Sequence, residues 1–179
     1  MKNNVVLIGM PGAGKSTNGL LLAKALGKDF VDTDVLIQVR EGKTLQQILD
    51  NSDYLKLRQI EESALIEIDL NNTVIATGGS AVYSTTGMAT LKQNGIIVYI
   101  ETPLKTLKQR INDYETRGIA KHPRQSFDDL FSERCKLYNQ YADITIYCDQ
   151  QSPEDIVKCI LKSLDHDKWS SDFQRKKTG

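Results

Sequence analysis

The sequence contains few of the residues that build metal cages or disulfide frameworks. Its three cysteines, Cys135, Cys148 and Cys159, form no C-x-x-C pair, and its two histidines are isolated. An odd number of well-separated cysteines favours neither a disulfide framework nor a thiolate zinc site. We therefore expect a reduced, cytoplasmic protein in which the cysteines are packing residues.

Excess charge and long apolar runs are absent as well. Lys+Arg and Asp+Glu both count 23, and the sequence pI is about 6.7. A neutral chain has no basic field to attract a nucleic acid or an anionic membrane. The apolar runs are short and interrupted, so none is expected to cross a bilayer, and the first residues show no secretory leader. We expect neither a nucleic-acid partner nor a membrane partner.

The chain of 179 residues suits one domain, in which short apolar strands alternate with helices. Continuous Val, Ile and Leu without alternation is typical of strands buried on both faces. This alternation predicts an α/β fold with a mainly parallel sheet and helices on both of its faces. The predicted strands are 5–9, a short one from Phe30, 73–77, 96–100 and 144–147, and the predicted helices are 15–26, a stretch closed near Gly42, 53–70, 85–94, 103–112, 126–141 and 152–164.

Two stretches stand apart from this alternation. Residues 113–125 have two arginines, a glycine, a proline and no clear period, which predicts a mobile loop and a candidate lid. Residues 166–179 are polar and charged, and we expect a mobile tail whose last basic residues, 175–177, aid solubility. The predicted domain therefore spans 1–165.

Residues 9–16, GMPGAGKS, fit the phosphate-binding pattern G-x-x-x-x-G-K-[ST] between an apolar strand and a helix. Glycines let successive backbone N–H groups point at phosphate oxygens, and the start of the helix adds its positive dipole end. Lys15 is expected to bring a full charge to the β and γ phosphates during transfer, and the Ser16 hydroxyl to bind Mg²⁺. The predicted nucleotide-binding residues of this P-loop are Gly12, Ala13, Gly14, Lys15, Ser16 and Thr17.

The second predicted strand ends in FVDTD, with two carboxylates beside the P-loop. Ligands of this architecture bind beyond the carboxyl ends of the strands. Asp32 is expected to hold Mg²⁺ through water, and Asp34 to orient an acceptor hydroxyl and take its proton late in transfer. The alternative is that either aspartate merely caps the following helix.

At this point the sequence resembles the shikimate kinase family. The resemblance rests on GMPGAGKS, FVDTD, LRQIE at 57–61, the TGG turn after TVIA, and ERCKLY followed by YADITI. It covers about residues 1–164. It implies a P-loop kinase fold, a three-layer α/β/α sandwich around a five-stranded parallel sheet. It also implies transfer of the γ-phosphoryl group of ATP, with Mg²⁺, to the 3-hydroxyl of shikimate in aromatic amino-acid biosynthesis. We expect the enzyme to be a monomer.

The resemblance also implies roles for individual residues. Asp34 would bind the acceptor hydroxyls, Arg58 and Arg134 the shikimate carboxylate, Gly78 and Gly79 would approach the ring, Arg117 would close over the phosphates as a catalytic residue, and Arg110 would lie beside the adenine. An arginine fits a carboxylate because its planar guanidinium binds it bidentately. Glu61 lies one helical turn after Arg58 and could hold its guanidinium. The alternatives are that Arg58 is a solvated helix charge and that Arg134 forms an ordinary ion pair with Glu133 or Asp129.

Two positions depart from the family pattern. The family usually has a third glycine where this chain has Ser80, whose hydroxyl could donate to a different acceptor or could point away. The family also usually has proline after the lid arginine, where this chain has Gly118, and glycine loosens what proline would stiffen. Both departures concern the acceptor and the lid. A paralogous kinase acting on another polyol or hydroxy acid therefore remains an alternative, as does an ATP-binding regulator without activity.

Overall fold

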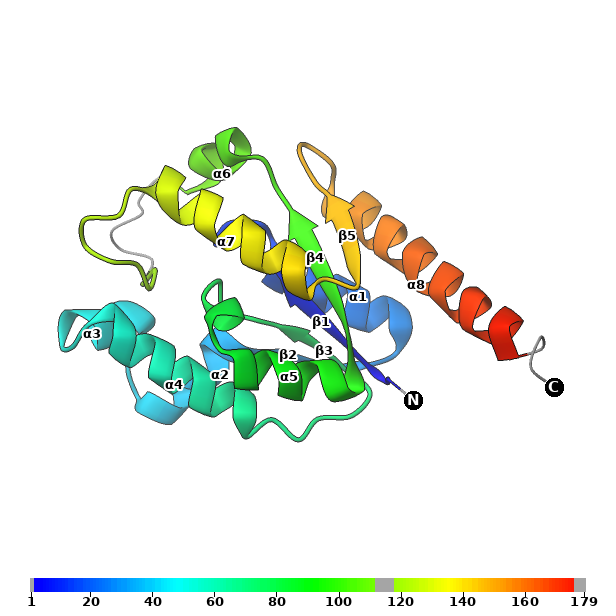
Figure 1. Cartoon of the computed structure of the whole chain (residues 1–179), viewed down its shortest axis with the longest axis horizontal. Helices are drawn as coiled ribbons and strands as arrows, with labels where there is room; N and C mark the ends of the chain where they lie inside the picture. The colour runs from blue at the N-terminus through cyan, green and yellow to red at the C-terminus, as the bar shows by residue number, and fades with distance from the viewer. Residues whose placement is uncertain (1, 112–117, 176–179) are drawn as a thin grey trace.

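The computed structural model describes residues 2–111 and 118–175, with side chains as far as Asp165. Five parallel strands form one sheet in the order β2-β3-β1-β4-β5 (Figure 1). The strands are β1 (Asn4–Ile8), β2 (Asp29–Asp32), β3 (Thr73–Ala76), β4 (Gly95–Glu101) and β5 (Ile144–Tyr147). The predicted five-stranded parallel sheet is confirmed.

Helices cover both faces of this sheet. They are α1 (Lys15–Leu26), α2 (Thr33–Glu41), α3 (Leu45–Asp50), α4 (Tyr54–Ile66), the 3-10 turn η1 (Ala81–Tyr83), α5 (Thr85–Asn94), α6 (Leu104–Arg110), α7 (Phe127–Tyr141) and α8 (Pro153–Arg175). Helices α1 and α8 pack together on one face, and α5 and α7 lie on the other (Figure 1). The predicted α/β/α sandwich is therefore correct.

The main hydrophobic core lies between the sheet and these two helix layers. Every residue of β1 and β3 is buried, which explains why their sequences, NVVLI and TVIA, read as nearly continuous apolar runs. Helix α1 ends at Gly27, whose φ of 62° is the left-handed conformation that commonly terminates helices. Helix α7 begins at a capping box formed by Ser126 and Asp129, as the predicted cap at Ser126 requires.

A second, smaller core lies beyond the β2 edge of the sheet. Its buried residues come from α2, α3, α4 and the described part of the predicted lid, namely Ile37, Ile48, Leu57, Ala64 and Ala120. Helices α2 and α3 both pack on α4 (Figure 1). These three helices therefore form a small lobe beside the carboxyl ends of the strands.

Helices α3, α4 and α8 differ from the sequence-based expectation. Helix α3 was not predicted, and its start depends on a capping box between Thr44 and Gln47. Helix α4 begins after its predicted cap, Asp53, but ends at Ile66 rather than at Leu70. The backbone of α8 continues to Arg175, well past Leu164, because no glycine or proline interrupts it. Within the described part of the chain, no helix is both long enough and apolar enough to cross a membrane.

Candidate active site

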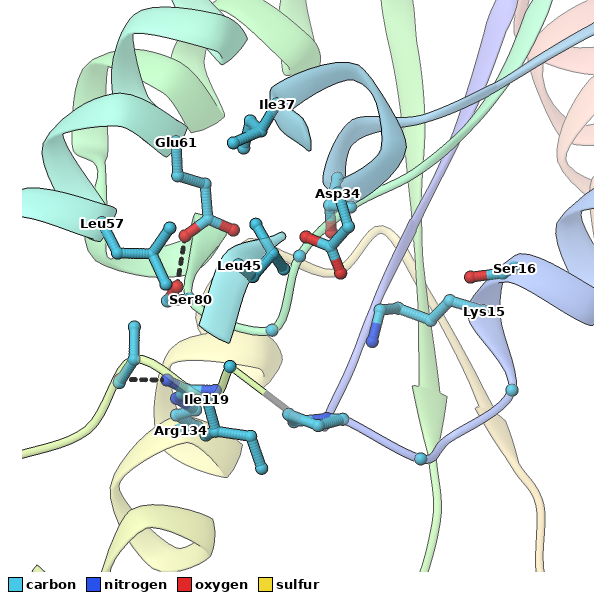
Figure 2. A pocket seen from close by; sticks show the side chains of 18 of the residues that line it. Lys15, Ser16, Asp34, Ile37, Leu45, Leu57, Glu61, Ser80, Ile119 and Arg134 are labelled. Atoms are coloured by element: carbon cyan, nitrogen blue, oxygen red, sulfur yellow. Dashed lines mark hydrogen bonds between the residues drawn. The ribbon is translucent and has the colours of Figure 1, made fainter. Parts of the chain in front are cut away.

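A cavity of about 350 Å³ opens at the carboxyl ends of β1, β2 and β3 (Figure 2). The ends of these strands are joined by threonine hydrogen bonds: Thr77 N–H and Oγ1 both donate to Leu7 O, at 3.1 and 3.0 Å. Gly78 N–H donates to Thr33 Oγ1 at 3.0 Å. The segments that follow the three strands are therefore held side by side around one cavity.

The P-loop forms one end of the cavity. Gly9, Gly12 and Gly14 all have positive φ angles, of 148°, 82° and 89°, which residues with a side chain rarely adopt. The loop leads into α1, whose first residue is Lys15, so the helix N-terminus points at the cavity. Gly12, Gly14, Lys15, Ser16 and Thr17 line the cavity, whereas Ala13 is fully buried behind it.

Lys15 is the cation at this end. Its side chain is 8% exposed, and Nζ donates to the carbonyls of Gly9 and Met10 at 2.8 and 3.0 Å. Burial lowers the pKa of Lys15 to about 8, while the nearby Asp34 carboxylate acts in the opposite direction. The ammonium is thus held by the loop and directed toward the space where phosphates would lie.

Asp34 faces Lys15 across the cavity (Figure 2). Burial raises the pKa of Asp34 to about 6, and the Lys15 charge opposes this rise. Asp32 does not line the cavity: it is the N-cap of α2, and its Oδ1 accepts the Asp34 N–H at 3.0 Å. Asp32 therefore caps α2 through one carboxylate oxygen, and its second carboxylate oxygen is not used by the cap.

The turn after β3 forms the floor of the other end of the cavity. Besides the bond from Gly78 to α2, Gly79 O accepts the Tyr138 hydroxyl of α7 at 2.6 Å. Ser80 Oγ donates to Glu61 Oε2 of α4. Each of the three residues of this turn is thus tethered to a different helix. The Ser80 hydroxyl therefore does not point away from the site but is bound to a side chain of the protein itself.

Both glycines of this turn are required by close approaches. A Cβ on Gly78 would clash with Glu61 Oε1 and lie 2.7 Å from Asp34 Oδ1. A Cβ on Gly79 would lie 2.8 Å from Arg134 Nη1. Two carboxylates and one guanidinium therefore converge on backbone that carries no side chain, as expected where a ligand must pass close to the chain.

Glu61 is fully enclosed beside this turn. It is 4% exposed, and its Oε1 has no hydrogen-bond partner in the described structure. Burial and the Asp34 charge raise the pKa of Glu61 to about 7, whereas the Ser80 hydrogen bond acts in the opposite direction. The suggested contact between Glu61 and Arg58 is not present, because the carboxylate is bound to Ser80 instead.

Arg134 is the cation of this end of the cavity. It is 1% exposed, and its Nη2 donates to Ala120 O at 2.7 Å, while Nε has no partner among the described residues (Figure 2). Among the described side chains it forms no ion pair with Glu133 or Asp129, so the ion-pair alternative is wrong. A buried, incompletely bonded guanidinium is a ready partner for a carboxylate.

Arg58 lies outside this cavity. Its guanidinium stacks on the Tyr83 ring, with Cζ 3.6 Å from the ring centroid, and Nε has no hydrogen-bond partner in the part of the chain that the structure describes. It lines a neighbouring hollow whose wall also includes Glu61 and Ser80. The alternative of a solvated helix charge is wrong for Arg58, because its side chain is partly buried against Tyr83.

Arg110 lies at the nucleotide end of the cavity. Arg110 lines the cavity, and its guanidinium donates to Gly12 O at 3.5 Å and to Asp149 O at 3.1 Å, linking the P-loop to the segment after β5. Arg117 lies outside the described residues, as does the first part of the predicted lid. Gly118 lines the cavity with a φ of 64°, and its N–H donates to Gln46 Oε1 at 2.9 Å.

Sequence reasoning did not assign roles to Thr33, Thr77, Tyr138 or Gln46. Thr33 lies between the two aspartates, so its place beside the cavity could have been inferred. Tyr138 lies four residues after Arg134 and therefore on the same face of α7. No sequence pattern indicated a role for Gln46, because α3, the helix in which it lies, was not predicted.

A P-loop, a facing aspartate and a buried arginine in one cavity of an α/β sandwich define a P-loop phosphotransferase. Comparison with known proteins narrows this class. A family model described as shikimate kinase matches residues 11–165. The chain belongs to the shikimate kinase family, and its activity is that of an ATP-dependent phosphotransferase.

Individual relatives agree with this assignment. The chain is 36% identical over 169 residues to a shikimate kinase of Haemophilus influenzae strain PittEE, with 92% of this chain and 94% of the relative covered. It is 36% identical to that of Persephonella marina, with 88% and 96% covered. Among solved structures, the shikimate kinase of Acinetobacter baumannii in complex with shikimate superposes with a TM-score of 0.86 at 33% identity, over 93% of this chain and 94% of that one.

Proposed function

We propose that this cavity transfers the γ-phosphoryl group of Mg²⁺-bound ATP to the 3-hydroxyl of shikimate. The observation that carries the proposal is that Lys15 and Asp34 face each other across one cavity that continues to Arg134. Phosphoryl transfer requires a cation at the phosphates, an acceptor hydroxyl in line with them and a group that accepts the proton. The cavity has a cation, Lys15, and a carboxylate, Asp34, on either side of the space in which the acceptor hydroxyl would lie.

At the nucleotide end, the backbone N–H groups of the P-loop would bind the phosphates, and Lys15 would exchange its carbonyl partners for β and γ phosphate oxygens. Ser16 and Thr17 line the cavity at the start of α1, and Arg110 would lie beside the adenine. Arg117 remains the predicted arginine over the phosphates. Catalysis would come mainly from placement and charge neutralisation.

The oxygen donors present suit Mg²⁺. Ser16 presents an exposed hydroxyl at the cavity, and Asp32 has a carboxylate oxygen that its cap does not use. In residues 2–111 and 118–165, no three His, Cys, Asp or Glu side chains cluster as a metal cage. This suits an ion held by one or two protein oxygens together with phosphates and water. When bound, Mg²⁺ would neutralise charge on the phosphates.

At the acceptor end, Asp34 would bind and orient the acceptor hydroxyl and take its proton as the bond to phosphorus forms. Arg134 would bind the acceptor carboxylate, with Gly78 and Gly79 beside the ring. Arg58 would move off the Tyr83 ring in the neighbouring hollow and bind the same carboxylate. Apolar side chains of Ile37, Leu57 and Ile119 would exclude water from the ring.

We also propose a monomeric, cytoplasmic enzyme of aromatic amino-acid biosynthesis. The cavity is built from a single chain, and its three cysteines are free thiols. A gluconokinase from Sinorhizobium meliloti shares the fold at 18% identity and a TM-score of 0.55, which leaves a different hydroxy acid as the alternative acceptor.

An ADP-release assay with ATP, Mg²⁺ and shikimate tests the proposal. Gluconate and a blank without acceptor serve as controls, and Lys15→Ala controls for contaminating kinases. We expect turnover with shikimate well above the blank, little with gluconate, and none with Lys15→Ala. Shikimate turnover no greater than the ATPase blank would reject the acceptor assignment.

A further inference from the structure

The pair formed by Ser80 and Glu61 lies at the boundary between two hollows. Both residues line the main cavity, and both line the neighbouring hollow that holds Arg58. Glu61 and Arg58 come from α4 and are three residues apart, so their side chains are neighbours on the helix surface. A buried carboxylate one turn from an arginine ordinarily pairs with it, because an unpaired buried charge is unfavourable.

That ion pair is not formed here. Glu61 Oε2 accepts the hydroxyl of Ser80, while Arg58 stacks on Tyr83 and keeps a free Nε. Tyr83 is itself fixed, because its hydroxyl donates to Glu133 of α7 at 2.5 Å. The serine hydroxyl therefore binds this carboxylate in place of the guanidinium, and among the described residues Arg58 forms no ion pair with Glu61.

The same hydrogen bond fixes the position of Glu61 at the acceptor end. Its Oε1 and the Oδ1 atom of Asp34 both lie close to Gly78, on the side where a Cβ would point. The direct cause of this placement is the Ser80 hydroxyl, since Oε1 has no partner of its own.

We propose that Ser80 is a positioning residue for acceptor binding. By donating to Glu61 it holds that carboxylate beside Gly78 and prevents it from neutralising Arg58, which stays available for the carboxylate of the acceptor. This inference rests on the proposed function, because it presumes an acceptor that carries a carboxylate.

Ser80→Ala removes the hydroxyl and frees Glu61 to pair with Arg58. We expect the KM for shikimate to rise about tenfold, the size expected for one hydrogen bond to a charged group, with the KM for ATP unchanged. Ser80→Thr keeps the hydroxyl and should retain a KM near that of the wild type. Shikimate methyl ester, which lacks the charge, should show a much smaller difference between wild type and Ser80→Ala.

Glu61→Gln provides the second test, because an amide cannot neutralise Arg58. Adding Ser80→Ala to Glu61→Gln should change the KM for shikimate by no more than about threefold, since a neutral hydrogen bond is roughly half as strong as a charged one. Ser84→Ala is the matched control: Ser84 is also buried, but its Oγ caps α5 by accepting the Gly87 N–H at 2.9 Å. It should lower the melting temperature without changing either KM.

The experiments separate a failure of the proposed function from a failure of the role assigned to Ser80. If wild-type protein does not phosphorylate shikimate, the proposed function fails. If it does, the role of Ser80 is overturned when Ser80→Ala raises both KM values equally, raises neither, or raises the KM for shikimate tenfold in the Glu61→Gln background too. A threonine variant as impaired as the alanine variant would also overturn it.

Discussion

The buried carboxylate of Glu61 should make the stability of the ligand-free protein depend on pH. Burial raises the pKa of Glu61 from 4.5 to about 7, so the folded protein keeps a proton that the unfolded chain has lost between these values. Unfolding therefore releases a proton in this window, and the free energy of unfolding falls as pH rises. Each pH unit contributes about 1.4 kcal/mol, so the loss between pH 4.5 and pH 8 is about 3 kcal/mol.

Glu61→Gln isolates this contribution, because glutamine has the same shape and does not titrate. The variant and the wild type should be of similar stability near pH 4.5, and the variant should be more stable by about 3 kcal/mol at pH 8. Burial also raises the pKa of Asp34, to about 6, which adds a slope of the same sign to both proteins. Because the Asp34 charge also contributes to the raised pKa of Glu61, the comparison of the two proteins removes that slope only in part.

Urea unfolding followed by far-UV circular dichroism at four pH values and constant ionic strength measures the difference. Glu62→Gln is the control, because the carboxylate of Glu62 is only partly buried and does not line the main cavity. Its difference from the wild type should vary less with pH. A difference between Glu61→Gln and the wild type that is constant from pH 5 to pH 8, or that shrinks, would refute the reasoning.

Three further substitutions test the cavity. Asp34→Asn should lower kcat by at least about 100-fold with little change in ATP affinity measured by calorimetry, because a positioned base contributes mainly to the transfer step; equal losses in both would contradict its assigned role. Arg134→Lys should raise the KM for shikimate at least about tenfold, since lysine cannot bind a carboxylate bidentately, and an unchanged KM would remove Arg134 from the acceptor site. Gly118→Pro should raise the KM for shikimate and lower the free energy of unfolding by roughly 2–3 kcal/mol, because proline can neither adopt a φ of 64° nor donate the N–H that bonds to Gln46. A variant with the melting temperature and kinetics of the wild type would show that this bond has no role.

The sheet and the P-loop could be predicted because their signals are local. The run VVLI, the glycines of GMPGAGKS and the helix formers after Lys15 lie within a few residues of one another, and each dictates its own backbone. The same holds for the caps at Asp53 and Ser126, whose side chains bond to backbone three residues later. Helix ends were less predictable, because α8 extends over a polar stretch that gives no apolar period.

The acceptor end could be predicted only in part, because its contacts join residues far apart in the chain. Arg134 was found from its motif, but its bond to Ala120 depends on how α7 packs beside the lid segment. The position of Arg58 depends on a choice of partner between Glu61 and Tyr83. That choice is made by the Ser80 hydroxyl, whose effect the sequence left open between donation and no contact.

Part of the acceptor end rests on a different core from the P-loop, and this difference has a functional consequence. The P-loop follows β1, which lies at the centre of the sheet and in the large main core. Asp34, Glu61 and the wall at Ala120 depend on the small core of α2, α3 and α4. Fewer buried apolar contacts hold this lobe, so its free energy of local opening is expected to be lower than that of the sheet. Hydrogen exchange should therefore be faster in α2–α4 than in β1 and β4, and binding of shikimate should slow it there more than in the sheet. Equal protection of both regions would mean that the lobe is as rigid as the P-loop and does not adjust to the acceptor.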